Sequence, residues 1–402
     1  MELVNVDAIE SARELLRGIT QVTPVANSRV LAHAVGGPVQ LKCENLQRGG
    51  SFKIRGAYVR IRRLSPEQRD RGVVAASAGN HAQGVALAAG LVGAKARVFM
   101  PIGAALPKIE ATRSYGATVE MAGTVVDETL AAAKEWADRH GAEFIHPFNH
   151  RDIIAGQGTI GLEIMEQCPQ ARTVLVGLGG GGLASGVAAA IKARHPDVRV
   201  VGVQADGAAA FPGSLAAGHP VPLKSMATMA DGIAVGQPGD LTFAHVRALV
   251  DEVLTVSEES LSRALLLCLE RAKLVVEPAG VATVAAIMDD PGRFEPPVVA
   301  VLSGGNIDPV VLGRVIQYGM VSAGRYLSCR LRIPDRPGEL AAMLQSLAAL
   351  GANVVNVEHS RTGSALHLGE VEVALSVETR GESHSEELLR TLREAGHTLV
   401  FG

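Results

Sequence analysis

Lys53 is the first residue whose setting suggests chemistry. It follows Phe52 in the stretch GGSFKIRGAY, where most neighbours are small or apolar and the nearest cations are Arg48 and Arg55. Burial in an apolar pocket lowers the pKa of a lysine and frees the neutral amine, which can form a Schiff base. A lysine can also pack its stem and leave the ammonium group in water. Other parts of the chain must decide between these interpretations.

A glycine loop offers a second chemical group. The run GLGGGGLASG, residues 177–186, follows a β-branched stretch and precedes an alanine-rich one. It fits the GxGxxG pattern of dinucleotide sites, but the next expected strand ends in Gln204 instead of an acid that would hold a ribose. Backbone amides before a helix can also surround a phosphate, and tight strand–helix packing remains the alternative. A phosphate is the favoured interpretation.

Together, the lysine and the glycine loop suit a cofactor that carries both a phosphate and an aldehyde. Lys53 is then a candidate anchor for pyridoxal phosphate, because a desolvated amine can attack the aldehyde. NAD binding stays a minority alternative, against which Gln204 argues.

The elements that must position these groups are strands and helices in alternation. Between about residues 70 and 315, short β-branched runs alternate with alanine-rich helical stretches, which predicts an α/β fold with βαβ units on parallel sheets. Several expected strands end in glycine-containing loops, namely SAGN, GLGGGGL and SGGN. Ligands bind beyond the carboxyl ends of such strands, so we expect these loops to face one shared crevice.

The pattern changes near the C-terminus. From Tyr326 onward, alternating strand-like runs and helical runs follow the order βαββαβ. This order predicts a ferredoxin-like domain over residues 325–402, after a linker at 319–324 and a larger domain at 1–318. The closing strand is expected over HTLVF, residues 397–401.

Composition narrows the class of partner. The formal charge is −3 over 402 residues, and basic residues are scattered without aromatic neighbours, so we expect a small-molecule ligand instead of nucleic acid or a membrane surface. The four cysteines are far apart and contain no CxxC pair, which argues against a zinc cluster and fits a reducing cytoplasm. The first residues lack the pattern of a secretory signal.

Six motifs, in this order, closely resemble one enzyme family. They are GGSFKIRGA, ASAGNHAQGVA, GQGTIGLEI, GLGGGGLASG, VVEPAG and LSGGN. Over about residues 5–318 the chain resembles the threonine/serine dehydratases, or ammonia-lyases, of fold type II pyridoxal-phosphate enzymes. The resemblance implies a tryptophan synthase β-like fold with two parallel-sheet subdomains, the smaller one inserted at roughly 50–150. The stretches RYLSCRLRIPDRPGEL and GANVVNVEHSR resemble a single ACT-type regulatory domain.

The resemblance implies roles for the cofactor site. Lys53 would form the Schiff base and take the α-proton, with Phe52 beside the cofactor ring. Asn80 would bond the ring hydroxyl, and Ser303 would meet the pyridine nitrogen. The backbone amides of the glycine loop would hold the phosphate; their residues are Gly179, Gly180, Gly181, Gly182 and Leu183.

The resemblance also implies a loop for the substrate carboxylate, formed by Ser77, Ala78, Gly79, Asn80 and His81. His81 could equally be a hydrogen-bonded histidine at the start of a helix. Glu277 in VEPAG resembles a family residue near the ring, and a structural hydrogen bond is the alternative. The implied reaction is β-elimination of L-threonine to 2-oxobutanoate and ammonia, and of L-serine to pyruvate.

Departures from the family patterns separate the relatives. Serine racemases carry a serine where this chain has Ala78, whose methyl group gives no proton, so racemisation is disfavoured. The related cation site uses two acids where this chain has Gln204 and Ala210, so we expect no metal there. The alternative from a different class is an amino-acid sensor that has kept the fold and lost catalysis. For the C-terminal domain, the resemblance implies isoleucine as effector and valine as antagonist, and a packing or oligomerisation unit without a ligand is the alternative. We expect a homodimer or homotetramer.

Overall fold

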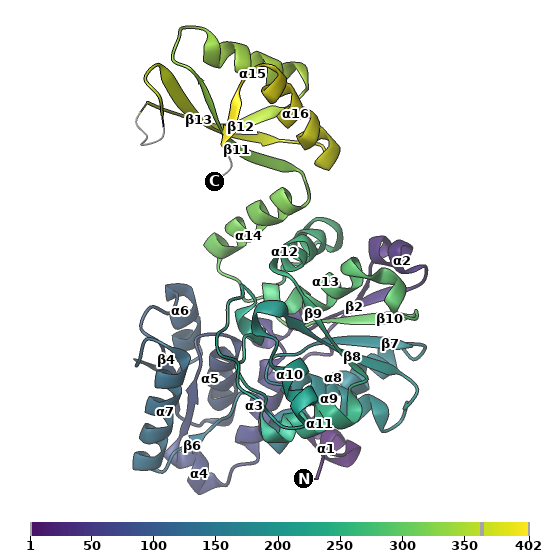
Figure 1. Ribbon diagram of the computed structural model, residues 1–402. Coiled ribbons are helices and arrows are strands. Elements are labelled where there is room, and N and C mark those ends of the chain that lie inside the picture. Colours follow the sequence, from purple (N-terminus) through teal and green to yellow (C-terminus); the bar gives the residue numbers. More distant parts are fainter. Residues whose placement is uncertain (1, 362–365, 401–402) are drawn as a thin grey trace. The chain divides into compact units, whose positions relative to one another are not determined.

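The chain divides into two units, residues 1–312 and residues 313–402, in the computed structural model (Figure 1). The structure describes residues 2–361 and 366–400, apart from the side chains of residues 126 and 127. Helix α14 (Pro309–Ser322) crosses the division and continues into the segment that we expected to be a linker. The two units are therefore described separately.

A six-stranded sheet forms the larger half of the first unit, with the strand order β1-β2-β10-β7-β8-β9. All neighbouring strands in it are parallel except β1 and β2. The central strands are apolar and fully buried, as parallel strands covered on both faces must be. The bounds are β1 (Val25–Asn27), β2 (Val39–Cys43), β7 (Thr173–Gly177), β8 (Arg199–Ala205), β9 (Glu252–Val256) and β10 (Val298–Leu302).

A smaller sheet, with the order β5-β4-β3-β6, is wholly parallel and lies beside the larger one in the first unit (Figure 1). Its strands are β3 (Val73–Ala76), β4 (Ala96–Met100), β5 (Thr118–Met121) and β6 (Glu143–Phe144). Helices α5 (Asn80–Val92), α6 (Leu106–Ser114) and α7 (Val126–His140) connect them. The predicted α/β fold with two parallel-sheet subdomains is thereby confirmed.

Helix α8 (Arg151–Gln167) connects the two chemical segments through close backbone contacts. A Cβ atom on its Gly156 would lie 2.6 Å from the Cα atom of Gly56 in α3 (Lys53–Arg62). A Cβ atom on Gly186 of α9 (Gly182–Lys192) would lie 2.3 Å from the carbonyl oxygen of Ile154 in α8. Only glycine permits such an approach. Helix α8 thus positions both the lysine helix and the helix that follows the glycine loop.

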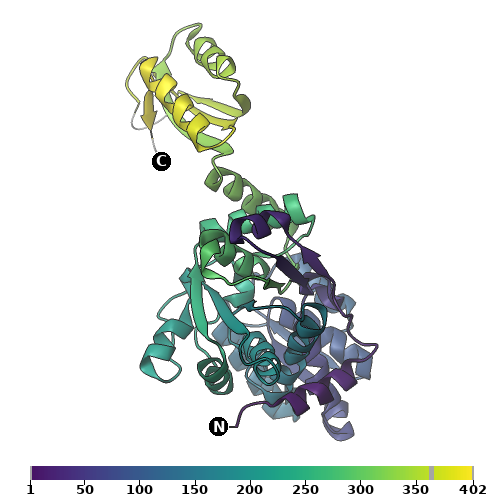
Figure 2. The same cartoon turned by 90° about the vertical axis from the view of Figure 1, so that its right-hand side faces the viewer.

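The other helices of the first unit cover the two sheets. The N-terminal helix α1 packs its buried Ile9 against Gly158 of α8, on the side seen in Figure 2. The remaining helices are α1 (Val6–Leu16), α2 (Arg29–Val35), α4 (Pro66–Arg71), α10 (Ala210–Ala217), α11 (Asp240–Leu249), α12 (Glu258–Leu267) and α13 (Ala282–Asp289). Short turns include η1 (Glu44–Leu46), η2 (Arg48–Gly50), η3 (Asp206–Ala208), η4 (Asp231–Ile233), η5 (Cys268–Ala272), η6 (Pro278–Val281) and η7 (Pro291–Arg293).

The second unit has an antiparallel sheet with the order β12-β13-β11-β14, which is the ferredoxin-like order. Its elements are β11 (Tyr326–Pro334), α15 (Glu339–Ala349), β12 (Asn353–Ser360), β13 (Glu370–Glu378), α16 (Glu382–Glu394) and β14 (Thr398–Val400). Strand β13 begins directly after a turn in which Gly369 has a φ of +93° and the Glu370 amide donates to the His367 carbonyl. Residue 401 of the expected last strand lies outside the described residues.

No helix in the described part of the chain is long and apolar enough to cross a membrane. The long uncharged run at residues 173–191 instead divides into β7, the glycine loop and most of α9.

Candidate active site

Lys53 is the first residue of helix α3 and is half-buried. Its Nζ atom lies 3.4 Å from the carbonyl oxygen of Pro147 and 5.1 Å from the centre of the Phe52 ring. Desolvation lowers the pKa of Lys53 to about 8, and the charge of Glu277 opposes this shift. An amine with this pKa is about one-tenth neutral at pH 7, which makes Lys53 a far better nucleophile than an ordinary lysine.

Asn80 lies at the start of α5 and connects two other polar residues. Its Nδ2 atom donates to Oε1 of Glu277 at 2.6 Å, and its Oδ1 atom accepts from Nδ2 of Asn306 at 2.8 Å. Asn306 also donates to the carbonyl oxygen of Gly49 at 2.7 Å. The SAGN loop of the small subdomain therefore meets the SGGN loop and the segment just before Lys53.

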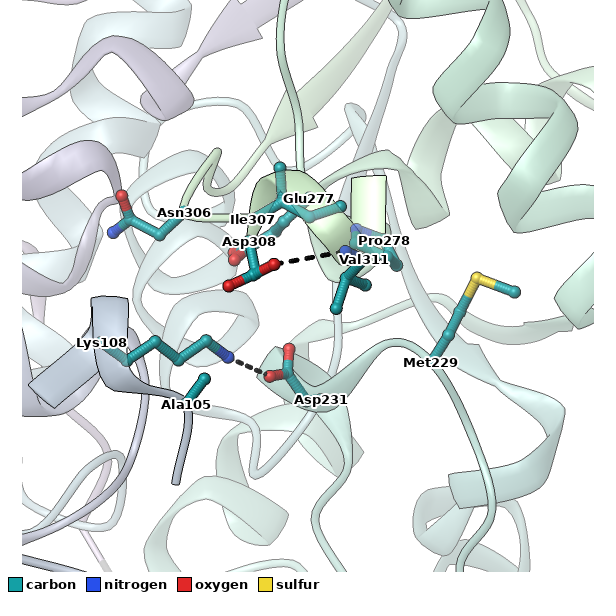
Figure 3. Close-up of a pocket in the computed structure, with 10 residues that line it drawn as sticks. All are labelled: Ala105, Lys108, Met229, Asp231, Glu277, Pro278, Asn306, Ile307, Asp308 and Val311. Atoms are coloured by element: carbon teal, nitrogen blue, oxygen red, sulfur yellow. Dashed lines mark hydrogen bonds and ion pairs between the residues drawn. The ribbon is translucent and has the colours of Figure 1, made fainter. Parts of the chain in front are cut away.

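Glu277 is a buried acid with only 4% of its surface exposed. Desolvation, followed by the charge of Asp231, raises the pKa of Glu277 to about 8, while the Asn80 hydrogen bond and Lys108 act in the opposite direction. The carboxyl group is therefore mostly protonated at neutral pH. Glu277 also lines a cavity of about 100 Å³, shown in Figure 3.

Ser303 is buried at the end of β10, next to the lysine segment. Its carbonyl oxygen accepts a hydrogen bond from the Phe52 amide at 3.2 Å. A Cβ atom on Gly177, at the end of β7, would lie 4.0 Å from its Oγ atom. A Cβ atom on Gly304 would lie 2.2 Å from Oε1 of Glu277, so glycine is required there. The three strand-end loops thus meet, as the sequence predicts.

The glycine loop joins β7 to α9. Gly181 has a φ of +95°, which favours glycine, and α9 begins at Gly182. Among the described residues, the backbone amides of Gly179, Gly180 and Gly181 have no hydrogen-bond acceptor. The first amides of α9 lack partners within the helix, and the helix dipole favours an anion beside them. Unsatisfied amides in this arrangement form a cradle for a phosphate.

A segment that we did not single out, residues 146–149, connects this loop to Lys53. Pro147 supplies the carbonyl oxygen near the Lys53 amine, and the next residue, Phe148, lies against the loop. A Cβ atom on Gly180 would lie 2.3 Å from the Phe148 ring. His146 accepts the amide of Phe148 at 3.2 Å, and burial lowers the pKa of His146 to about 4, so this histidine is neutral. In the sequence, the stretch HPFN after a short strand is the only feature that could have drawn attention to this segment.

The predicted substrate loop lies between β3 and α5. Ser77 donates its amide to the Phe99 carbonyl at 3.0 Å and accepts the Gly79 amide on its Oγ atom at 3.1 Å. His81 is buried, and its Nε2 atom lies 2.8 Å from the Ile145 carbonyl oxygen. Desolvation lowers the pKa of His81 to about 3. Its neutral ring is thus engaged by backbone, while half-buried Ala78 adds only a methyl group.

A buried ionic cluster anchors α3 two residues after Lys53. Arg55 is fully buried and donates to Glu44 at 2.8 Å and to Glu163 at 2.6 Å. Lys42, also fully buried, donates to the same Glu163 at 2.6 Å. These two acids raise the pKa of Arg55 despite the opposing effect of desolvation. The cluster ties α3 to β2, η1 and α8.

Gln204 stands where the related cation site has an acid, a position at which we expect no metal. Gln204 is buried and accepts the Phe211 amide on its Oε1 atom at 2.9 Å. Among the described residues, no group of three or more His, Cys, Asp or Glu side chains could hold a metal ion. All four cysteines are buried free thiols.

These groups fit pyridoxal phosphate: a lysine with a lowered pKa, a cradle of unsatisfied amides, and an Asn80 side chain that is hydrogen-bonded to Glu277. The fold and the site define a fold type II pyridoxal-phosphate enzyme. The chain belongs to the family described as "Pyridoxal-phosphate dependent enzyme", whose profile matches residues 16–304. The predicted cofactor and fold are thereby confirmed.

Similar proteins refine this placement. The L-threonine ammonia-lyase of Thermotoga maritima is 46% identical over 395 residues, which are 98% of each chain. A T.th. threonine deaminase of known crystal structure is 39% identical, with a TM-score of 0.72, and the match covers 76% of this chain and 99% of that one. Maize serine racemase is 37% identical, with a TM-score of 0.75, and the match covers 78% of this chain and 97% of that one.

Proposed function

We propose that this protein is a threonine ammonia-lyase, which converts L-threonine to 2-oxobutanoate and ammonia and also accepts L-serine. The observation that carries the proposal is the lowered pKa of Lys53 beside the Asn80–Glu277 pair, in a chain that is 46% identical to an L-threonine ammonia-lyase over almost its full length. The two substrates differ by one methyl group, which a pocket distinguishes by only about 1–3 kcal/mol.

In this proposal, Lys53 anchors the cofactor and then moves the α-proton of the substrate. Its lowered pKa keeps part of the amine neutral and able to accept a proton. When the Lys53 amine is not bonded to cofactor, it donates a hydrogen bond to the Pro147 carbonyl oxygen, 3.4 Å away, which keeps it in the site. When bound, pyridoxal phosphate supplies an aldehyde for the substrate amine and an electron sink for the α-carbon.

Other residues bind and orient. The amides of Gly179 to Leu183 would hold the phosphate. Asn80, which is hydrogen-bonded to Glu277 and Asn306, would bond the ring hydroxyl. Ser303 would hydrogen-bond the pyridine nitrogen, and Phe52 would lie beside the ring. The loop of residues 77–81 would receive the substrate carboxylate. The Ser77 and Gly79 amides already donate to the Phe99 carbonyl and to Ser77 Oγ, so the amides of Ala78, Asn80 and His81 would do this. For His81 it is the backbone amide, because its ring is hydrogen-bonded to the Ile145 carbonyl.

Serine racemisation is the second candidate, favoured by the fold shared with maize serine racemase. Racemisation needs an acid on each face of the α-carbon. Ala78 in the substrate loop has no proton to give, which supports elimination over racemisation. An inactive amino-acid sensor remains the alternative if no turnover is found.

We propose residues 325–402 as an ACT-type regulatory domain that binds isoleucine, with valine as antagonist, in a homodimer or homotetramer. The ferredoxin-like strand order of the second unit supports this assignment. An effector regulates only through unequal affinity for two states of the enzyme, so binding alone would not suffice. The cytoplasm is the proposed location, in keeping with four buried free thiols.

Release of 2-oxo acid and ammonia from L-threonine and L-serine, with and without isoleucine, tests these proposals. We expect both substrates to react and isoleucine to lower the rate with L-threonine. Absence of turnover with both would refute the lyase assignment. An unchanged isoleucine response after deletion of residues 325–402 would exclude regulation by that domain.

A further inference from the structure

An ion pair joins the two subdomains at the cavity beside Glu277. Lys108 lies on α6, in the small subdomain, and Asp231 begins η4 in the large one. The Nζ atom of Lys108 lies 2.6 Å from Oδ2 of Asp231. Both residues line the cavity of about 100 Å³, and Figure 3 shows their side chains pointing toward each other. The pair thus forms one wall of a space next to the candidate active site.

Turn η4 brings Asp231 close to Glu277 and to the glycine loop. A Cβ atom on Gly232, the next residue, would lie 3.6 Å from Oε1 of Glu277. The Cα atom of Ile233 is 2.9 Å from where a Cβ atom on Gly179 would be, so the same turn contacts the glycine loop. Asp231 therefore lies on an element that packs between Glu277 and the expected phosphate cradle.

The pair is accessible, and its charges are available to a ligand. The Lys108 side chain is 21% exposed and the Asp231 side chain 61% exposed, and such pairs contribute little net stability. Asp308 also lines the cavity, but its Oδ1 atom already accepts hydrogen bonds from the amides of Val310 at 2.7 Å and Val311 at 3.3 Å. Lys108 and Asp231 thus offer one positive and one negative group side by side.

We propose that Lys108 and Asp231 form a subsite that binds the α-amino acid as a zwitterion before it reaches Lys53. The substrate carboxylate replaces Asp231 on the Lys108 ammonium group, and the substrate ammonium group replaces Lys108 on the Asp231 carboxylate. One ion pair becomes two, and no charge is left unpaired. This subsite rests on the proposed function, because it takes an amino acid as ligand.

A competing interpretation is a simple latch between the subdomains. A latch depends on the pair alone, so loss of either charge would affect every ligand in the same way. A zwitterion subsite is different, because Lys108 meets only the carboxylate and Asp231 meets only the ammonium group. L-threoninamide, which has the ammonium group but no carboxylate, distinguishes the two interpretations.

The test uses holoenzyme reduced with borohydride, which fixes the cofactor on its lysine and stops turnover. Calorimetry then measures the dissociation constants of L-threonine and L-threoninamide for the wild type and for Lys108→Gln and Asp231→Asn. We expect Lys108→Gln to raise the dissociation constant of L-threonine about three- to tenfold and that of L-threoninamide less than about twofold. Asp231→Asn should raise the dissociation constants of both ligands about three- to tenfold.

Lys192→Gln is the control. The Lys192 side chain is 15% exposed, against 21% for Lys108, and it forms an ion pair with Asp251 outside the cavity, so this substitution should change neither affinity. Equal weakening of both ligands by Lys108→Gln would reduce the pair to a latch and overturn the subsite. Unchanged L-threonine affinity in that variant, or no L-threonine binding by the reduced wild type, would overturn it as well. Failure of the unreduced enzyme to release 2-oxobutanoate would instead refute the proposed reaction, independently of these affinities.

Discussion

Replacing Arg55 with Met removes the cation shared by two buried carboxylates, and we expect the free energy of unfolding to fall by about 3–5 kcal/mol. Arg55 is fully buried, and its guanidinium group donates to both oxygens of Glu44 and both oxygens of Glu163 at 2.6–3.0 Å. Methionine fills a similar volume, so the loss reflects the charges and hydrogen bonds instead of a cavity.

The remaining contacts determine the size of this loss. Glu163 keeps Lys42 at 2.6 Å, so it stays paired with a cation. Among the described residues, Glu44 keeps only the Thr23 hydroxyl as a side-chain partner, at 2.6 Å. One buried carboxylate is therefore left without a cation, which corresponds to breaking a single buried pair. Adding Glu44→Gln to Arg55→Met should recover part of the loss, because it removes that unpaired charge.

Urea unfolding followed by far-UV circular dichroism measures the effect. Arg63→Met is the control at the opposite, C-terminal end of α3. Arg63 is 28% exposed and pairs with Asp152 at 2.6 Å, so its loss should cost less than about 1 kcal/mol of unfolding free energy. If the free energy of unfolding of Arg55→Met stayed within about 1 kcal/mol of the wild-type value, the ionic cluster would not anchor α3.

Two further predictions concern the site. Gly180→Ala places a methyl group 2.3 Å from the Phe148 ring and should weaken cofactor binding about tenfold or more in a titration, while Gly213→Ala, with open space around it, should not. Glu277 has its pKa raised to about 8, so its contribution to stability is present below about pH 4.5 and is lost as the pH rises to 8. Urea unfolding of cofactor-free protein at pH 5 and pH 8 should therefore show a fall on the order of 3 kcal/mol that Glu277→Gln lacks; equal falls in both proteins would contradict the buried acid.

The fold and much of the site could be predicted from local patterns. Buried parallel strands such as Val298–Leu302 are apolar throughout, and the glycine loops stand where strands end. These features depend on near neighbours in the sequence, so the sequence alone suggests them. The ferredoxin-like order of the last unit was visible for the same reason.

The groups that hold Lys53 in place could not be predicted this way. Lys42, Glu44, Arg55 and Glu163 resemble ordinary surface charges in the sequence, since charged residues are rarely buried without partners. Their partners lie more than 100 residues apart in the case of Arg55 and Glu163, and only the fold brings them together. The Pro147 carbonyl is a backbone group and leaves no side-chain signal at all.

The position of the cofactor tests the central claim most directly. Borohydride reduction of the holoenzyme, proteolysis and mass spectrometry identify the lysine that carries the pyridoxyl group. The arrangement around residue 53 predicts the added mass on Lys53 and on no other lysine. Finding it on another lysine, such as Lys108 at the cavity or Lys42 in the buried cluster, would contradict the account.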